Sequence, residues 1–237
     1  MARSTFPALD LEAGAAQVHS RSMLQGLIQS LRPQQWTKNL FVLAALPFGL
    51  KLFDPAAVAL ALAAFVVFCA LSGVVYLVND LYDREADRLH PVKRLRPIAA
   101  GVLAPGAAAT AAALIAGGAL LSAAAIGLRF AVASASYLAL FYLYSRWLKH
   151  LVIIDVLSIA IGFVLRTYAG AVAIGVPVSD WLLVCTVLLA LFLGLSKRRH
   201  ELTLLAGGAA GHRRILDEYN PYLLDQMIGV VTASTLM

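Results

Sequence analysis

The sequence predicts an all-α protein, a polytopic bundle of transmembrane helices. Of its 237 residues, 61% are hydrophobic and only 14% are charged, and the mean hydropathy is +0.81. Apolar runs of about 18 to 25 residues recur along the chain, and a helix of that length crosses a bilayer. This composition excludes a soluble two-domain protein.

We predict seven spans, and each is bounded by recognisable signals. Pro33 and Trp36 precede the first span as a helix starter and an interface residue, and Asp54 with Pro55 makes the turn before the second. The third span is rich in Ala and Gly, which lets neighbouring helices approach closely. Trp181 stands at the interface before the sixth. The predicted spans are residues 36–53, 56–78, 103–127, 130–144, 151–174, 181–195 and 222–237.

The distribution of basic residues predicts the orientation. If residues 1–30 form a cytoplasmic tail, sixteen Lys and Arg lie on the cytosolic side, Lys51 and Arg129 lie outside, and Arg166 lies within a span. Cytoplasmic loops of membrane proteins carry the excess of bases. We therefore expect a multi-pass protein of the plasma (inner) membrane with its polar site facing the cytosol. The net charge of +6 is explained by orientation and contact with phospholipid headgroups, and no nucleic-acid partner is expected.

Residues 79–101, NDLYDREADRLHPVKRLRPIAAG, follow the second span and are unusually charged. On a helix, Asn79, Asp80, Asp83 and Asp87 fall within about one quarter of the circumference. Like charges at this spacing destabilise a helix unless they are neutralised, and carboxylate oxygens with substrate phosphates are what Mg²⁺ accepts. We predict a magnesium site here; the alternative is a solvated acidic loop.

Bases follow the acids directly, at His90, Lys93, Arg94 and Arg96. Cations beside a carboxylate-held metal are a recurring way to stabilise a diphosphate leaving group. The pattern therefore indicates a phosphorylated substrate, with ordinary headgroup contact as the alternative.

The fifth span contains Asp155 and Arg166, which lie about 20° apart around a helix. Ionisable residues inside a membrane are functional candidates, although such a pair can also tie helices together. Tyr144 and Lys149, just upstream, carry a phenol and an ammonium that could reach a phosphate, but both types are common at interfaces.

These residues carry a resemblance. The chain resembles the UbiA superfamily of intramembrane prenyltransferases in two elements. The first is NDxxDxxxD, matched by Asn79, Asp80, Asp83 and Asp87, and the second is RPxxxG, matched by Arg96, Pro97 and Gly101. RPQQWTKNLFVLAAL (32–46), HPVKRLRPIAAG (90–101), YSRWLKH (144–150) and LSKRRHEL (195–202) resemble the decaprenyl-phosphate phosphoribosyltransferase branch.

The resemblance implies a bundle of usually nine spans around a cavity open to the cytosol. It implies Mg²⁺-dependent transfer of 5-phosphoribose from phosphoribosyl pyrophosphate to a polyprenyl (decaprenyl) phosphate, with release of pyrophosphate, in cell-wall arabinan precursor synthesis. On this basis residues 31–237 form a transmembrane catalytic domain, and since the seventh span stops at Met237 we expect part of a longer protein. The family's DxxxD second motif is replaced here by Tyr144 and Lys149.

The resemblance also implies residue roles. Asp80, Asp83 and Asp87 are the expected catalytic residues and, together with Asn79, hold the metal. The expected binding residues for donor and acceptor phosphates are Lys38, Asn39, Asn79, Lys93, Arg94, Arg96, Tyr144 and Lys149, while Asp155 and Arg166 are expected to line the cavity.

Three other functions remain open from the sequence. The first is a UbiA-type prenyltransferase that moves a prenyl group from a prenyl diphosphate to an aromatic acceptor. The second is a membrane transporter, although we find no internal repeat and most charges gather at one end of the spans. The third is a non-catalytic scaffold, which leaves the clustered carboxylates unexplained. A homo-oligomer with contacts through the Ala-rich spans is also expected.

Overall fold

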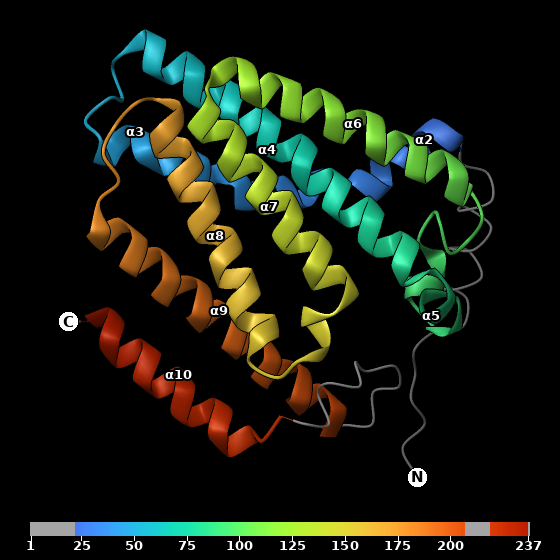
Figure 1. The fold of residues 1–237 in the computed structure, drawn as a ribbon. Coiled ribbons are helices and arrows are strands. Elements are labelled where there is room, and N and C mark those ends of the chain that lie inside the picture. The colour runs from blue at the N-terminus through green and yellow to red at the C-terminus, as the bar shows by residue number, and fades with distance from the viewer. Residues whose placement is uncertain (1–21, 207–218, 237) are drawn as a thin grey trace.

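The computed structural model describes residues 22–206 and 219–236, and every regular element in these two ranges is helical (Figure 1). Residues 1–21 of the predicted tail lie outside them. The elements are α2 (Met23–Leu31), η1 (Pro33–Ala44), α3 (Ala45–Phe48), α4 (Pro55–Tyr82), α5 (Arg84–Leu89), η2 (Lys93–Leu95), α6 (Pro105–Ile126), α7 (Leu128–Arg146), η3 (Leu148–His150), α8 (Ile154–Ala173), α9 (Asp180–Ala206) and α10 (Pro221–Leu236), where η marks a 3₁₀ helix.

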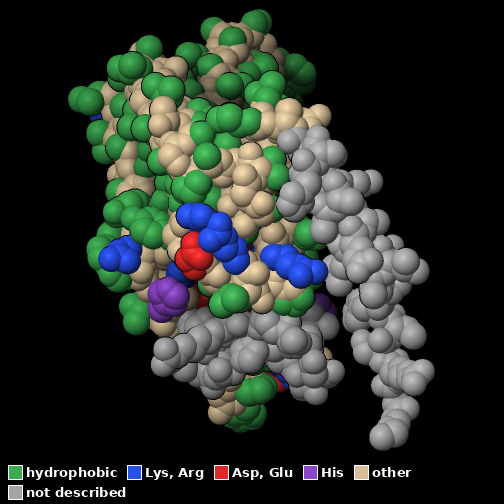
Figure 2. All heavy atoms as spheres, turned by 90° about the vertical axis from the view of Figure 1, so that its right-hand side faces the viewer, with side chains coloured by type: hydrophobic (Ala, Val, Ile, Leu, Met, Phe, Trp, Pro, Cys, Tyr) green, Lys and Arg blue, Asp and Glu red, His purple; other side chains and the backbone are tan. Residues whose placement is uncertain are grey.

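The long helices run back and forth between two ends of a bundle (Figure 1). Turns at residues 49–54, 127 and 174–179 lie at one end, and α5, η2 and η3 lie at the other. Two helices are central, since α4 packs against η1, α6, α7 and α8, and α8 packs against η1, α7 and α9. Figure 2 views the molecule from the side where α5 lies, and Lys and Arg side chains gather there below a mostly hydrophobic surface.

In residues 22–206 and 219–236, four helices are long and apolar enough to cross a bilayer: α4, α6, α8 and residues Asp180–Thr203 of α9. They match the second, third, fifth and sixth predicted spans. The other three predicted spans are also helical but fall outside this group. α10 has only 16 residues, α7 carries more polar side chains, and the first span is not a regular α-helix. The predicted fold class, a polytopic helical bundle, is confirmed.

The first span differs from the α-helix predicted over residues 36–53. It is a 3₁₀ helix of 12 residues followed by the single turn α3. A 3₁₀ helix rises about 2.0 Å per residue, compared with about 1.5 Å in an α-helix, so these 12 residues extend further along the bundle than the same number would in an α-helix. It also packs closely on α8, because a Cβ on Gly170 would lie 1.9 Å from the Val42 carbonyl oxygen.

The turn into α4 forms as predicted. Asp54 is the N-cap, with its Oδ1 accepting from the backbone N–H groups of Ala56 (3.1 Å) and Ala57 (3.2 Å), and Pro55 occupies the first helical position. These contacts satisfy N–H groups that have no partner inside the helix. The Lys51 ammonium bonds to the Asp54 carboxylate, and this bond lowers the pKa of Asp54.

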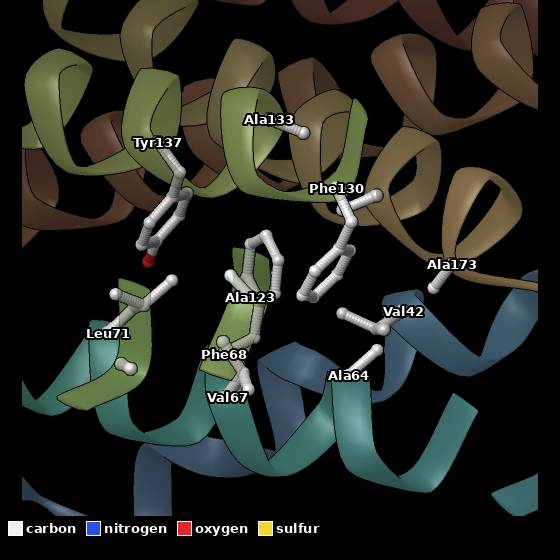
Figure 3. Close-up of a cluster of buried hydrophobic side chains, with 12 residues drawn as sticks. Val42, Ala64, Val67, Phe68, Leu71, Ala123, Phe130, Ala133, Tyr137 and Ala173 are labelled. Atoms are coloured by element: carbon white, nitrogen blue, oxygen red, sulfur yellow. The ribbon is translucent and has the colours of Figure 1, made fainter. Parts of the chain in front are cut away.

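The largest core cluster joins η1, α4, α6, α7 and α8 (Figure 3). Its aromatic centre consists of Phe68 with Phe130 (ring centroids 5.9 Å apart) and Tyr137 (5.2 Å). Small residues such as Ala64 and Ala133 surround these rings and let the helices approach. Tyr137 therefore has two roles, because its ring belongs to this core while its hydroxyl bonds to Arg166.

The predicted boundary between tail and membrane domain, at residues 30/31, falls within the last turn of α2. This helix begins with a capping box at Ser22 and Gln25 and packs against α4. A Cβ on Gly73 would lie 2.7 Å from the Leu31 side chain. The end of the predicted tail is thus packed on the bundle and leads directly into η1.

Candidate active site

The predicted acidic face lies at the end of the bundle where α4 gives way to α5. α4 ends at Tyr82, Asp83 caps it, and α5 begins at Arg84. Within this face the polar side chains divide into two pairs, Asn79 with Asp83 and Asp80 with Asp87. Each pair has its own cations.

Asp80 and Asp87 are almost fully buried, at 2% and 4% exposure. The Arg96 Nη1 donates to both, at 3.1 Å to the Oδ1 of Asp80 and 2.6 Å to the Oδ2 of Asp87. A second guanidinium, that of Arg32, donates to the same Asp80 oxygen at 2.5 Å and lies 4.7 Å above the Tyr76 ring. Charge-assisted bonds of this kind offset the cost of burying the carboxylates.

The second pair is more open. The side chain of Asp83 is 31% exposed, and its Oδ2 accepts from the Asn79 amide at 3.0 Å. Its Oδ1 pairs with the Lys149 ammonium, which comes from η3 after α7. The loop after the fourth span therefore reaches the acidic face, so the two predicted segments meet at one place.

The oxygen ligands on this face fit a Mg²⁺ ion whose coordination shell is completed by a substrate, and they do not fit an ion enclosed by protein ligands alone. Within the described residues, no three or more His, Cys, Asp or Glu side chains converge closely enough to hold an ion. Two pairs of oxygen-bearing side chains are present instead, and Mg²⁺ commonly binds one or two carboxylates together with substrate phosphates and water.

A cavity of about 270 Å³ opens beside these carboxylates, between η1, α4, α7, α8 and α9. Five basic side chains from four segments line it: Arg32 and Lys38 from the segment of η1, Arg96 after η2, Arg166 on α8 and Lys197 on α9. None of the described lining residues is acidic, and Asn79, Tyr76 and Tyr144 are among those that supply neutral polar groups. A cavity with this lining attracts anions.

Arg166 forms the deep wall of the cavity and is 5% exposed. Its guanidinium donates to the Oδ1 of Asn39 (2.9 Å), the hydroxyl of Tyr137 (2.6 Å) and the carbonyl of Gly162 (3.0 Å). It lies over the rings of Tyr137 (4.7 Å) and Phe163 (5.1 Å). In the described part of the chain it forms no salt bridge. Neutral acceptors and rings hold this cation, so its charge remains available to a ligand.

Asn39 was expected to bind phosphate, but the structure places it behind Arg166. It is 0% exposed and donates to the Ser72 hydroxyl (3.0 Å) and the Cys69 sulfur (3.4 Å). With both donors directed into α4, its oxygen faces Arg166. This geometry indicates that Asn39 orients the guanidinium, and Asn39 is not among the residues that line the cavity.

Asp155 does not share the cavity with Arg166, contrary to the expectation that both line it. It is 0% exposed, its Oδ2 accepts from the Arg198 Nε at 2.8 Å, and its Oδ1 accepts from the Tyr219 hydroxyl at 2.5 Å. Arg198 also pairs with Glu201. The two residues lie near one line on α8, but they are eleven positions apart, and Asp155 stands at the helix start, where it ties α8 to α9 and to the segment before α10.

Tyr219 completes this buried network. Its hydroxyl accepts from the backbone N–H of Ile153 at 2.8 Å, and Ile153 has a positive φ (68°) at the start of α8. Burial, and to a smaller extent the hydrogen bond to Asp155, raises the pKa of the Tyr219 phenol well above its usual range.

The remaining predicted binding residues are less central. Lys93 and Arg94 lie on η2, and neither lines the cavity. The sequence interpretation missed Arg32 and Lys197 as site residues. Both stand inside segments that carried the family resemblance, RPQQW and LSKRR, but their charge was attributed to orientation alone.

Comparison with known proteins agrees with this fold and motif. Residues 39–198 match the model of the UbiA prenyltransferase family. The decaprenyl-phosphate phosphoribosyltransferases of Mycolicibacterium smegmatis and Corynebacterium glutamicum are 40% and 42% identical to this chain, over 84% and 86% of its length. The matches span only 64% and 63% of the relatives' own lengths. A UbiA homolog from Archaeoglobus fulgidus bound to DMAPP and Mg²⁺ superposes with a TM-score of 0.71 at 22% identity, covering 88% of this chain and 74% of that one.

The fold and the basic, carboxylate-edged cavity define an intramembrane protein with a site for anionic substrates. The chain belongs to the UbiA prenyltransferase family, and it is a multi-pass membrane protein.

Proposed function

We propose that this chain transfers 5-phosphoribose from phosphoribosyl pyrophosphate to a polyprenyl phosphate and releases pyrophosphate. The observation that carries the proposal is the cavity lined by five bases and no described acid, next to the paired carboxylates. A prenyl diphosphate with an aromatic acceptor such as 4-hydroxybenzoate brings one diphosphate and one carboxylate. Phosphoribosyl pyrophosphate and a lipid phosphate together bring a diphosphate and two monophosphates, which matches the larger number of bases. The curated relatives of the same name support this choice.

Asn79, Asp80, Asp83 and Asp87 would hold Mg²⁺, which neutralises charge on the diphosphate leaving group when bound. Arg96 and Arg32 now satisfy Asp80 and Asp87, and their guanidiniums also line the cavity. The two guanidinium groups can therefore exchange carboxylate oxygens for phosphate oxygens while the helices stay in place.

Arg166 carries positive charge to the buried wall of the cavity, and the exposed Lys38 adds a second cation to its lining, where a monophosphate would be held. The reaction needs no strong general base, because the acceptor phosphate is already an anion. One of its oxygens forms a bond to the ribose C1, the bond from C1 to the pyrophosphate oxygen breaks, and the electron pair leaves with pyrophosphate. Preorganised cations near the leaving group supply the main stabilisation.

The site is proposed to face the cytosol at the plasma membrane, where phosphoribosyl pyrophosphate is soluble and the acceptor resides in the bilayer. The excess of bases at the end of the bundle that carries α5 supports this orientation.

The test uses the chain in lipid nanodiscs with Mg²⁺. One reaction contains phosphoribosyl pyrophosphate labelled in the ribose and decaprenyl phosphate; a second contains labelled geranyl diphosphate and 4-hydroxybenzoate. We expect a labelled lipid and stoichiometric pyrophosphate in the first reaction only. A prenylated aromatic product would assign the alternative function. Uptake of substrate into sealed vesicles with no lipid product would indicate a transporter.

A further inference from the structure

A series of hydrogen bonds with a single direction runs behind the basic cavity, and it begins on α4. The hydroxyl of Ser72 has one proton, which it donates to the backbone carbonyl of Cys69 at 3.0 Å. Its oxygen can therefore only accept from the side chain of Asn39, whose Nδ2 lies 3.0 Å away. This bond turns the other end of the amide, the Oδ1, toward Arg166, from which it accepts at 2.9 Å. The Asn39 amide thus has a fixed orientation, set by α4.

The series continues through Arg166 to Tyr137 on α7. A guanidinium has only donors, so its Nη2 donates to the Tyr137 hydroxyl at 2.6 Å. Figure 3 shows the Tyr137 ring pointing from α7 toward α4, with this oxygen at its tip. Because the oxygen serves Arg166 as an acceptor, the phenol proton points elsewhere. Among the residues that the structure describes, this proton has no acceptor.

The surroundings of Tyr137 leave one direction for that proton. Its ring packs against Phe68 (centroids 5.2 Å apart) and Phe141 (4.8 Å), which carry no oxygen. Tyr137 and Arg166 both line the basic cavity, and they are only 1% and 5% exposed. A buried donor without an acceptor is costly, so we expect the acceptor to be supplied from the cavity.

The guanidinium of Arg166 and the phenol proton of Tyr137 together form a wall of donors only. Such a wall suits an oxygen that is negatively charged and carries no proton, and hydrogen bonds to an ionised oxygen are the strong ones. An ionised phosphate group supplies oxygens of this kind. A neutral hydroxyl fits less well, because its own proton would face two donors.

We infer that Tyr137 is a further binding residue, whose hydroxyl donates to an oxygen of the monophosphate held by Arg166. The inference rests on the proposed function. Two monophosphates enter the site in that reaction, the 5-phosphate of the donor and the phosphate of the lipid acceptor, and their oxygens present the same chemistry to Tyr137. The experiments below separate the two.

The kinetic test uses the sign of an effect at this hydroxyl. Tyr137→Phe keeps the ring in the core and removes the hydroxyl, so the KM for either phosphoribosyl pyrophosphate or decaprenyl phosphate should rise about tenfold, the effect of losing a hydrogen bond to a charged group. In a second protein, 3-fluorotyrosine replaces Tyr137. Its phenol keeps its proton at pH 7 but is a stronger donor and a weaker acceptor.

If Tyr137 donates to the phosphate, the fluorinated protein should have a KM below the wild-type value for the same substrate that Tyr137→Phe affects. If the hydroxyl only accepts from Arg166, fluorination should leave that KM unchanged or raise it, and this result would overturn the inference. Unchanged KM values for both substrates in Tyr137→Phe would also overturn it.

A binding test gives an answer even if no transfer activity is found. The ¹⁹F NMR signal of 3-fluorotyrosine at position 137 is followed in nanodiscs while ribose 5-phosphate or decaprenyl phosphate is added, each alone. At least one ligand should shift the signal to saturation, and that ligand identifies the monophosphate. The matched control carries the same analogue at Tyr168, which is 37% exposed on α8 and does not line the cavity, and its signal should not saturate.

Absence of a saturable shift at position 137 with both ligands, or an equal shift at position 168, would contradict the inference. A saturable shift at position 137 alone, in a chain that forms no transfer product with any acceptor, would support the phosphate site and reject the proposed reaction alone.

Discussion

Two clusters in this bundle pair a buried aspartate with an arginine from a distant segment, and they differ in their access to solvent. Asp80 and Asp87 bond to Arg96, whose side chain is 26% exposed and lines the basic cavity. Asp155 bonds to Arg198, and these side chains are 0% and 2% exposed. In the first, open cluster, Arg96 lines the cavity and can exchange its carboxylate partners for a ligand. The second, sealed cluster consists of Asp155, Arg198 and Tyr219, and none of these residues lines the cavity. Burial of a charged pair in a membrane helix therefore does not by itself identify a catalytic group.

The largest expected effect concerns Asp83, which lies on the same acidic face as Asp80 and Asp87 and pairs with Lys149. Asp83→Asn keeps the shape of the side chain and its bond with Asn79 but removes the charge that faces Lys149. We expect phosphoribosyl transfer to fall by at least about a hundredfold, the size of losing one preorganised electrostatic group. Product formation is measured in nanodiscs.

The matched control is Glu85→Gln, because Glu85 lies on α5 with its side chain 74% exposed and pairs with Arg88. It should retain nearly full turnover. An Asp83→Asn protein as active as this control would remove Asp83 from the proposed metal site.

Substitutions in the sealed cluster of Asp155, Arg198 and Tyr219 should lower the free energy of unfolding more than they lower activity. Arg198→Met leaves Asp155 as a buried charge bonded to Tyr219 alone. The expected loss is about 3–5 kcal/mol in the free energy of unfolding, measured by denaturant titration in detergent micelles. Adding Asp155→Leu should recover most of it, because a buried ion pair can be replaced by apolar groups at little cost. If the double variant is folded but inactive, Asp155 or Arg198 belongs to the site after all.

The sequence predicted the acidic face of the site but not the separate places of Asp155 and Arg166, and the contrast between the two clusters explains why. The acids at Asp80 and Asp83 were identifiable because their spacing on one helix is a local property. The division of roles between Asp155 and Arg166 was not identifiable, because it depends on which helices pack at each level of α8. Asp155 meets α9 and Tyr219, whereas Arg166 meets η1 and α7. The 3₁₀ form of the first span was missed for a similar reason, since the tight contact of Gly170 with Val42 joins segments far apart in the chain.

Arg166 should respond to substitution in a third way, because it is buried like Arg198 but faces the cavity. Arg166→Lys keeps the charge and loses the planar fork that bonds to both Asn39 and Tyr137. We expect a rise of about tenfold in the KM of one phosphorylated substrate, equivalent to about 1.4 kcal/mol, with little change in the unfolding midpoint.

The corresponding Asn39→Asp variant separates orientation from ligand contact. Its added negative charge would pair with Arg166 and compete with an anionic substrate, so KM should rise while the fold is retained. An unchanged KM in both variants would place the substrate phosphates elsewhere in the cavity.

The smallest expected effect is a pH dependence in the sealed cluster. Burial and Asp155 raise the pKa of Tyr219 in the folded chain, above the ordinary value near 10. Below pH 10 the phenol is protonated in both states and its stabilising contribution is complete. As the pH rises further, the unfolded chain releases this proton while the folded chain retains it, so stability falls. Tyr219→Phe should lose about 1.5–3 kcal/mol at pH 7 by removing a hydrogen bond to a charged group, and it should lack this part of the alkaline decline. Unfolding titrations of both proteins at pH 7 and pH 10.5 compare the two slopes, and parallel declines would show that another group causes the loss.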